Sequence, residues 1–292
     1  MRTTDRRAFL LGLSGAALGG ALGVWPGALS AAPLDKVRQT GVLRVAVYKD
    51  NKPWSWEEGG QLRGIDSDIA RALAEALGVR PDLAELMADE SVEDDLRNGV
   101  WKGGLLGFQP ADVMMHIPFD RTFAARNDQV AIVAPYYREK FTLACASGSG
   151  IDCEAVPREF RGRRLAVELD SIPDNYFLSV FGGLLAKDVV HYLSGSAAVQ
   201  AMTEGKADLA LTTAAQMENG LSEVGAERFV IRKSALPLMM SPGWDIGLAV
   251  KENSRSLGDA LEDSLGRMAS SGRLAEICSR YGVHWVAPLA GG

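Results

Sequence analysis

The sequence is poor in the residues that build metal, haem and nucleophilic sites. Its three histidines, His116, His191 and His284, lie far apart and show no metal-ligand spacing. There is no Cys-x-x-Cys-His haem-attachment motif, and no glycine-rich phosphate loop follows a strand in the required pattern. Neither a Ser/His/Asp nor a Cys/His arrangement is recognisable. The sequence therefore predicts a non-enzymatic protein without a metal ion or other cofactor.

The chain also lacks a hydrophobic run long enough for stable membrane insertion. Its most apolar stretch, residues 10–25, has about 16 weakly apolar residues, whereas a spanning helix needs about 20. A twin-arginine pattern around Arg6 and Arg7 precedes this stretch, and small residues up to Ala32 follow it. We therefore expect residues 1–32 to be a removable signal peptide for twin-arginine export, and the mature protein to be periplasmic.

An excess of basic residues is absent as well. Without residues 1–32, which hold three arginines and one aspartate, the chain has 28 basic and 36 acidic residues, a net charge of −8. This balance predicts no nucleic-acid or anionic-membrane surface and would attract a basic protein partner. The remaining length is enough for two compact domains or one large one.

Cysteine is scarce, and its count is odd for an exported protein. Cys145 and Cys153 are eight residues apart across a Gly-rich turn, which makes them the candidates for a local disulfide under periplasmic oxidation. Cys278 is then left over. The other two pairings, and three free buried thiols, remain alternatives.

Strand and helix patterns alternate along the chain. Residues 43–48 form a short apolar strand pattern, and apolar residues then recur every four positions over 65–77, as in a helix. A second set begins near residue 164, and two amphipathic helices are expected over 257–268 and 274–281. Alternation of this kind predicts an α/β protein with open sheets.

The stretch 110–137 gives the first resemblance. An apolar run at 113–115 follows Asp112, a basic turn intervenes, and a second apolar run over 130–134 ends in Pro135-Tyr136. This frame, with the C-terminal SGRLAEICSRYGV, resembles the family 3 (amino-acid-type) periplasmic solute-binding proteins.

That resemblance implies the type II periplasmic-binding-protein fold, with two α/β lobes, a hinge and a central cleft. The chain order then places lobe 1 at residues 33–138 plus 243–292 and lobe 2 at residues 139–242.

The resemblance also marks where an amino-acid ligand would be held. Arg126 lies ten residues before Tyr136, where the arginine of those proteins grips the α-carboxylate with its planar fork. Phe123 occupies the position of their accompanying threonine. An alternative for Arg126 is a solvated or structurally ion-paired arginine.

The second lobe departs further from that clamp. Thr213 stands where those proteins have the aspartate that holds the ligand's ammonium group, and a neutral hydroxyl cannot replace its charge. The loop after residue 169 begins Asp170-Ser171-Ile172-Pro173, which adds a negative charge and removes an N–H donor. The sequence thus predicts an incomplete amino-acid clamp.

Aromatic residues and one histidine stand near the same region. Trp54, Trp56 and Trp101 lie beside turn or Gly-rich segments, as at contact surfaces; the alternative is that they cover the edge of the core. His116 is a candidate acid/base partner of Asp120, with a lining or hydrogen-bonded role as the alternative. The candidates for the ligand or partner cleft are Trp54, His116, Asp120, Arg126, Asp170 and Thr213, and those for a partner surface are Trp56 and Trp101.

A more specific resemblance covers about 40 residues. DLRNGVWKGGLLGFQPADVMMHIPFD and FAARNDQVAIVAPYYRE are similar to the MxaJ/XoxJ-type accessory proteins of bacterial methanol oxidation. It implies a protein that binds a quinoprotein methanol dehydrogenase, or its c-type cytochrome, and assists maturation or activation of the calcium- or lanthanide-dependent enzyme. The alternative is the substrate-binding component of an ABC transporter for an amino acid or another small polar solute.

Overall fold

The computed structural model describes residues 33–104, 107–239, 241 and 243–289. The predicted twin-arginine signal peptide, residues 1–32, lies outside these residues. Within the described part of the chain, no helix has the length and apolar character needed to cross a membrane.

Five strands form the first sheet, in the order β5-β1-β6-β13-β7. Their bounds are β1 (Val42–Tyr48), β5 (Arg80–Leu86), β6 (Val113–Pro118), β7 (Val130–Glu139) and β13 (Trp244–Lys251). β1 runs parallel to β5 and β6, whereas β13 runs antiparallel to β6 and β7. A strand from the C-terminal part of the chain therefore completes a sheet begun by the N-terminal part.

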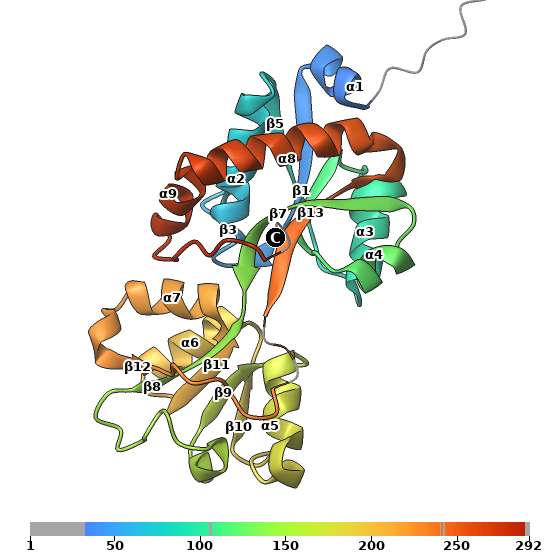
Figure 1. Cartoon of the computed structure of the whole chain (residues 1–292). Coiled ribbons are helices and arrows are strands. Elements are labelled where there is room, and N and C mark those ends of the chain that lie inside the picture. Colours follow the sequence, from blue (N-terminus) through green and yellow to red (C-terminus); the bar gives the residue numbers. More distant parts are fainter. Residues whose placement is uncertain (1–32, 105–106, 240, 242, 290–292) are drawn as a thin grey trace, which may run out of the picture. The chain divides into compact units, whose positions relative to one another are not determined.

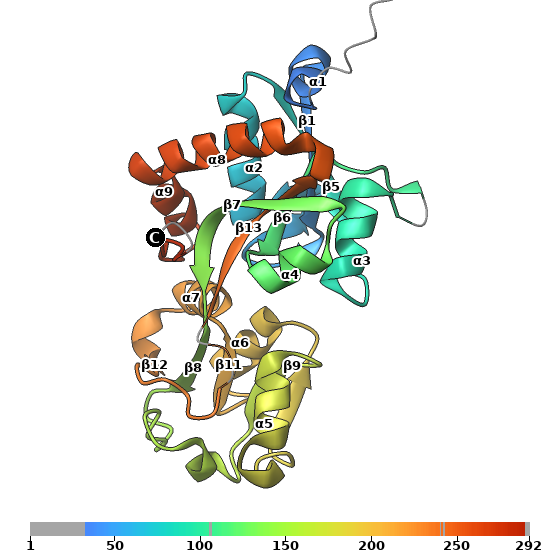
Figure 2. The same ribbon diagram turned by 45° about the vertical axis from the view of Figure 1, so that its right-hand side comes forward.

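Helices cover both faces of this sheet. On one face, α2 (Ile65–Ala76), α8 (Arg255–Ser270) and α9 (Arg273–Ser279) bury apolar residues in a shared core. Figure 1 and Figure 2 both show α8 running across the strands. On the other face lie α3 (Val92–Leu96) and the π-helical turn η1 (Arg97–Trp101). The predicted basic turn between β6 and β7 is a short helix, α4 (Arg121–Arg126).

Smaller elements complete this region. A three-stranded sheet joins β2 (Asp50–Asn51), β3 (Ser55–Glu58) and β4 (Gln61–Arg63). The helix α1 (Pro33–Thr40) packs against α8 and β1, and the turn η5 (Glu252–Ser254) precedes α8.

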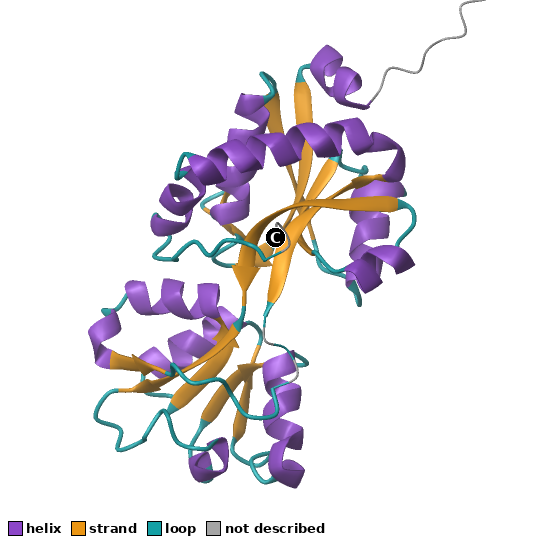
Figure 3. Ribbon diagram, viewed as in Figure 1, coloured by secondary structure: helices purple, strands orange, loops and turns teal. Residues whose placement is uncertain are grey.

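The second sheet has the order β10-β9-β11-β8-β12. Its strands are β8 (Phe141–Ala146), β9 (Leu165–Glu168), β10 (Val189–Tyr192), β11 (Leu209–Thr213) and β12 (Phe229–Ile231). Its helices are α5 (Ile172–Gly183), α6 (Gly195–Thr203) and α7 (Ala214–Ser222), with the turns η3 (Pro157–Phe160) and η4 (Ala226–Arg228). α5 packs into one apolar cluster, and α6 with α7 into another, so this sheet is also covered on both faces (Figure 3).

The chain passes directly from the first sheet to the second. β7 ends at Glu139 and β8 begins at Phe141, so Lys140 is the single residue between them. The chain returns through residues 232–243 to β13. The exact lobe boundaries, 33–138 plus 243–292 and 139–242, remain a prediction.

A disulfide joins Cys145 in β8 to Cys153, and its Cα atoms are 5.9 Å apart. Cys278 in α9 is a buried free thiol, and burial raises its pKa to about 12. The structure therefore has the local pairing that the sequence offered among its alternatives.

Candidate functional site

A pocket of about 480 Å³ lies where residues of both sheets approach each other. Its apolar lining consists of Pro118, Phe141, Ile172, Pro173 and Trp244. Its polar lining consists of Asn51, Glu168, Ser171, Thr212, Thr213, Gln216 and Ser241. Thr213 was among the residues expected to line a cleft, and it contributes to this pocket.

Each of the three longer helices of the second sheet begins with a capping hydroxyl. The hydroxyls of Ser171, Ser194 and Thr213 accept hydrogen bonds from backbone N–H groups at the starts of α5, α6 and α7, over 3.1 to 3.4 Å. Such caps satisfy N–H groups that a helix leaves without a partner. Thr213 therefore has a structural task, which fixes its side chain at the pocket edge.

Two of these helix starts also hold carboxylates from the chain itself. The N–H of Gly195, first residue of α6, donates to Glu168 Oε2 over 2.9 Å. The N–H of Ala214, first residue of α7, donates to Glu139 Oε1 over 3.0 Å. Helix N-termini are usual places for a bound anion, but at both of these positions a side chain of the protein already accepts from the first N–H.

Burial changes the acidity of both side chains, although Glu168 is only partly buried. Burial raises the pKa of Glu168, and it raises the pKa of the fully buried Glu139 to about 8. Glu139 Oε1 also accepts from the N–H of Lys140 over 2.9 Å, whereas Oε2 has no hydrogen-bond partner among the described residues.

Asp170 stands in the loop between β9 and α5. It is exposed and has a positive φ of 59°, and its backbone N–H donates to the Asp174 carboxylate over 3.0 Å. Pro173 occupies the first turn of α5, where a missing N–H costs nothing, and its ring lines the pocket.

His116 belongs to a largely buried polar cluster, and its partner there is Asp66. Its Nδ1 lies 3.1 Å from Asp66 Oδ2, and the hydroxyl of Tyr136 donates to Asp66 Oδ1 over 2.6 Å. The structure corresponds to the hydrogen-bonded alternative for His116 and not to a pair with Asp120, whose carboxylate accepts from the N–H of Phe123 and caps α4.

Trp54 closes this cluster on one side. Its ring centroid lies 4.9 Å from that of His116 and 4.8 Å from that of Tyr137, and the residue is 2% exposed. It is therefore a core residue, and the reading of Trp54 as an exposed aromatic contact is wrong.

Arg126 ends α4 on the surface. Its side chain is 64% exposed, and its guanidinium lies 3.6 Å from the carboxylate of Glu93 in α3. The geometry corresponds to the solvated, ion-paired alternative, and Arg126 is not among the residues lining the pocket.

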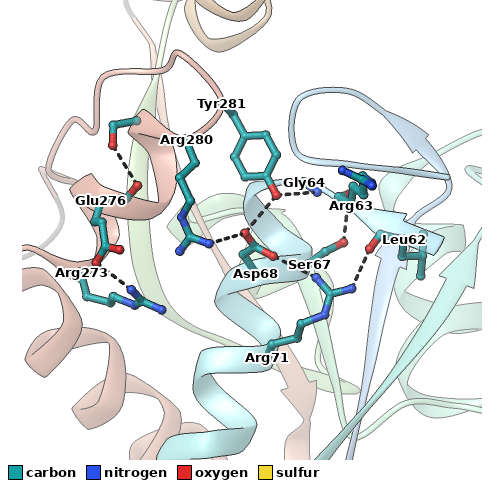
Figure 4. Close-up of polar contacts among 11 residues, drawn as sticks. Leu62, Arg63, Gly64, Ser67, Asp68, Arg71, Arg273, Glu276, Arg280 and Tyr281 are labelled. Atoms are coloured by element: carbon teal, nitrogen blue, oxygen red, sulfur yellow. Dashed lines mark hydrogen bonds and ion pairs between the residues drawn. The ribbon is translucent and has the colours of Figure 1, made fainter. Parts of the chain in front are cut away.

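Trp56 and Trp101 are both half-buried but lie in different places. Trp56 packs edge-on against Tyr281, with ring centroids 5.7 Å apart. Tyr281 and Arg280 donate to Asp68, and Arg71 bridges Asp68 to the Leu62 carbonyl, which ties α2 to the region after α9 (Figure 4). Trp101 instead packs against the core beneath α3 and η1.

Sequence reasoning missed the charged and aromatic residues of the pocket. Glu168 ends an apolar strand in the parallel part of a mixed sheet, and ligands of open α/β sheets lie at such carboxyl ends. The position of Glu168 at the end of this strand could therefore have been identified from the sequence. Phe141 and Trp244 sit at the two chain crossings, and only the three-dimensional structure brings their rings to 4.9 Å. No group of three or more metal-binding side chains occurs in the described part of the chain.

Comparison with known proteins supports the fold more than any single activity. No protein-family model matches the chain. Cyclohexadienyl dehydratase from Pseudomonas aeruginosa is 51% identical over 49 residues, which are 16% of this chain and 18% of the enzyme. The match thus spans less than a fifth of that enzyme's length.

Solved structures of amino-acid binding proteins match along most of the chain. An ancestral cationic amino acid solute-binding protein has a TM-score of 0.66 and 20% identity over 85% of this chain and 99% of its own. A substrate-binding protein from Streptococcus pneumoniae, bound to L-arginine, has a TM-score of 0.62 and 17% identity over 87% and 100%. One from Streptococcus thermophilus, for polar amino acid uptake, has a TM-score of 0.63 and 16% identity over 87% and 90%. The chain therefore has the expected two-lobed α/β fold of type II periplasmic solute-binding proteins.

Proposed function

We propose that the chain is an exported protein of the solute-binding fold that works as an accessory of a PQQ-dependent alcohol dehydrogenase. It assists maturation or activation of the dehydrogenase through contacts with that enzyme or its c-type cytochrome. Export follows the twin-arginine route to the periplasm, and the chain itself catalyses no reaction. The observation that carries this proposal is the occupation of the helix starts beside the pocket by the chain's own carboxylates.

An amino-acid ligand needs an anion site for its carboxylate. The first N–H groups of α6 and α7 already donate to Glu168 and Glu139, so neither group is left to bind the carboxylate of a ligand. Arg126, the other candidate for holding a carboxylate, pairs with Glu93 on the surface. Neither the helix starts nor Arg126 is therefore available to hold the α-carboxylate of an amino acid.

The surface around η1 supports the protein-binding half of the proposal. A hollow of about 430 Å³ there includes Arg97, Lys102 and Phe108, and Trp101 lies half-buried beside it. This segment carries the resemblance to the methanol-oxidation accessory proteins. Aromatic and arginine side chains are enriched in protein interfaces.

The test is affinity capture with the tagged mature protein from periplasmic extract of methanol-grown cells, with mass spectrometry of the captured proteins. We expect enrichment of a quinoprotein dehydrogenase or its c-type cytochrome, and loss of that enrichment in Trp101→Ala. Leu193→Ala is the matched control, because it removes a side chain that is 93% exposed in the second lobe. If neither protein is enriched, the accessory function is wrong.

The pocket of about 480 Å³ favours a second candidate, the substrate-binding component of an ABC transporter for a small polar solute. Apart from Glu168, its polar lining is neutral and can donate and accept hydrogen bonds. A ligand-dependent rise in melting temperature, together with no protein capture, would favour this second candidate.

A further inference from the structure

The electrostatics of the pocket are set mainly by one carboxyl group, that of Glu168. Among the described residues that line it, Glu168 is the only one with an ionisable side chain. Two residues later, the exposed Asp170 adds a second negative charge to the same loop. No lysine, arginine or histidine is among the lining residues to balance them.

Glu168 is held in place at the end of β9. Its Oε2 accepts from the N–H of Gly195 over 2.9 Å, and its Oε1 has no hydrogen-bond partner among the residues that the structure describes. A Cβ on Gly195 would lie 2.0 Å from Thr212 Oγ1 and 2.1 Å from Gln216 Oε1, so the start of α6 is packed tightly against two pocket residues. The carboxylate is thus fixed by its surroundings and leaves one oxygen for a ligand.

An aromatic pair provides the other half of a cation site. Phe141 in β8 and Trp244 in β13 lie with ring centroids 4.9 Å apart and planes at 47°, and both rings remain partly accessible. The faces of tryptophan and phenylalanine attract ammonium and guanidinium groups. They also pack against the alkyl part of a ligand.

We propose that this pocket binds a small organic cation that lacks a carboxylate. Its ammonium or guanidinium group pairs with Glu168, and its alkyl chain lies against Trp244 and Phe141. The α-carboxylate of an amino acid is rejected, because Glu168 and Glu139 occupy the nearby helix-start amides. This ligand site goes beyond the proposed accessory function and does not depend on a protein partner.

Agmatine and L-arginine make the sharpest pair of probes, since they differ only by the α-carboxylate. Isothermal titration of the mature protein should give agmatine binding at least about tenfold tighter than L-arginine binding. Equal or tighter binding of L-arginine would overturn the proposal, and so would the absence of agmatine binding at millimolar concentration.

Variants locate the binding. Glu168→Gln should weaken agmatine binding about tenfold or more while keeping an acceptor for the Gly195 N–H. Glu57→Gln, which removes an exposed carboxylate in β3, is the matched control and should leave binding unchanged. If Glu168→Gln folds poorly, Trp244→Leu is an independent variant that should also weaken agmatine binding. Unchanged agmatine affinity in folded Glu168→Gln and Trp244→Leu would refute the assignment. Agmatine binding and capture of the dehydrogenase are separate readouts, so either proposal can fail alone.

Discussion

His116 Nδ1 lies 3.1 Å from Asp66 Oδ2, although the two residues are 50 positions apart in the sequence. Asp66 belongs to the first turn of α2 and is 1% exposed, while His116 stands in β6 with a positive φ of 66°. The hydroxyl of Tyr136 in β7 donates to the same carboxylate. Asp66 thus ties a helix to two strands through polar contacts inside the first core.

Removing this carboxylate should destabilise the protein strongly. Asp66→Ala leaves the buried hydroxyl of Tyr136 and the ring of His116 without their partner, and an unpaired buried polar group costs about 1–3 kcal/mol. We expect a loss of about 3 kcal/mol or more in the free energy of unfolding, measured by urea denaturation.

Asp120→Ala is the control for that measurement. It removes a surface carboxylate that caps a short helix, which should cost about 1 kcal/mol. If the two variants lose the same stability, Asp66 does not organise the core in the way described.

The partner of His116 shows what sequence spacing cannot supply. Asp120 is close to His116 along the chain, whereas Asp66 meets it only because α2 packs on β6 across the sheet. Helix polarity alone explains an Asp in the first turn of a helix. Nothing in the neighbouring sequence therefore indicates that Asp66 also pairs with His116 and Tyr136. The periodicity of residues 65–77 did predict the helix that carries it.

Glu139 should make stability depend on pH. Burial raises its folded-state pKa from 4.5 to about 8, so the folded protein keeps a proton that the unfolded chain releases. Below pH 4.5 both states are protonated, and this stabilising effect is fully present. It is lost as the pH rises toward 8, with a slope of at most about 1.4 kcal/mol per pH unit.

Glu139→Gln tests that origin, because an amide stays neutral at every pH of interest. Chemical denaturation at pH 5, 6.5 and 8 should show the variant gaining stability relative to the wild type as the pH rises. Glu57→Gln, at an exposed position of β3, should show no such trend. A constant difference between Glu139→Gln and the wild type across the series would contradict the buried, protonated state.

The disulfide between Cys145 and Cys153 should contribute to stability in the oxidised protein. It closes a short loop, and for loops of this size the chain-entropy model gives about 2–3 kcal/mol. Reduction should lower the free energy of unfolding by that amount. The denatured protein should present one reactive thiol before reduction and three afterwards, and three before reduction would show that the bond does not form.

The fold was more predictable than the site for a physical reason. Apolar runs such as residues 43–48 and 130–134 are buried strands because each must cover both faces with hydrophobic side chains. A pocket instead depends on which strand ends meet. Phe141 and Trp244 are separated by most of the second lobe in the chain, yet their rings are in contact.

Thr213→Asp should not turn the protein into an amino-acid receptor. Aspartate caps a helix at least as well as threonine, so α7 should keep its start and the variant should fold. The added carboxylate offers an ammonium partner, but the N–H of Ala214 remains with Glu139 and Arg126 remains with Glu93. Titration with L-arginine and L-glutamine should therefore show no micromolar binding.

Thr213→Val is the control, because it keeps the shape of the side chain and loses the helix cap. It should cost about 1 kcal/mol of stability and bind neither amino acid. Micromolar affinity in Thr213→Asp alone would mean that the rest of an amino-acid clamp is intact, and that the carboxylates at the helix starts do not exclude the ligand.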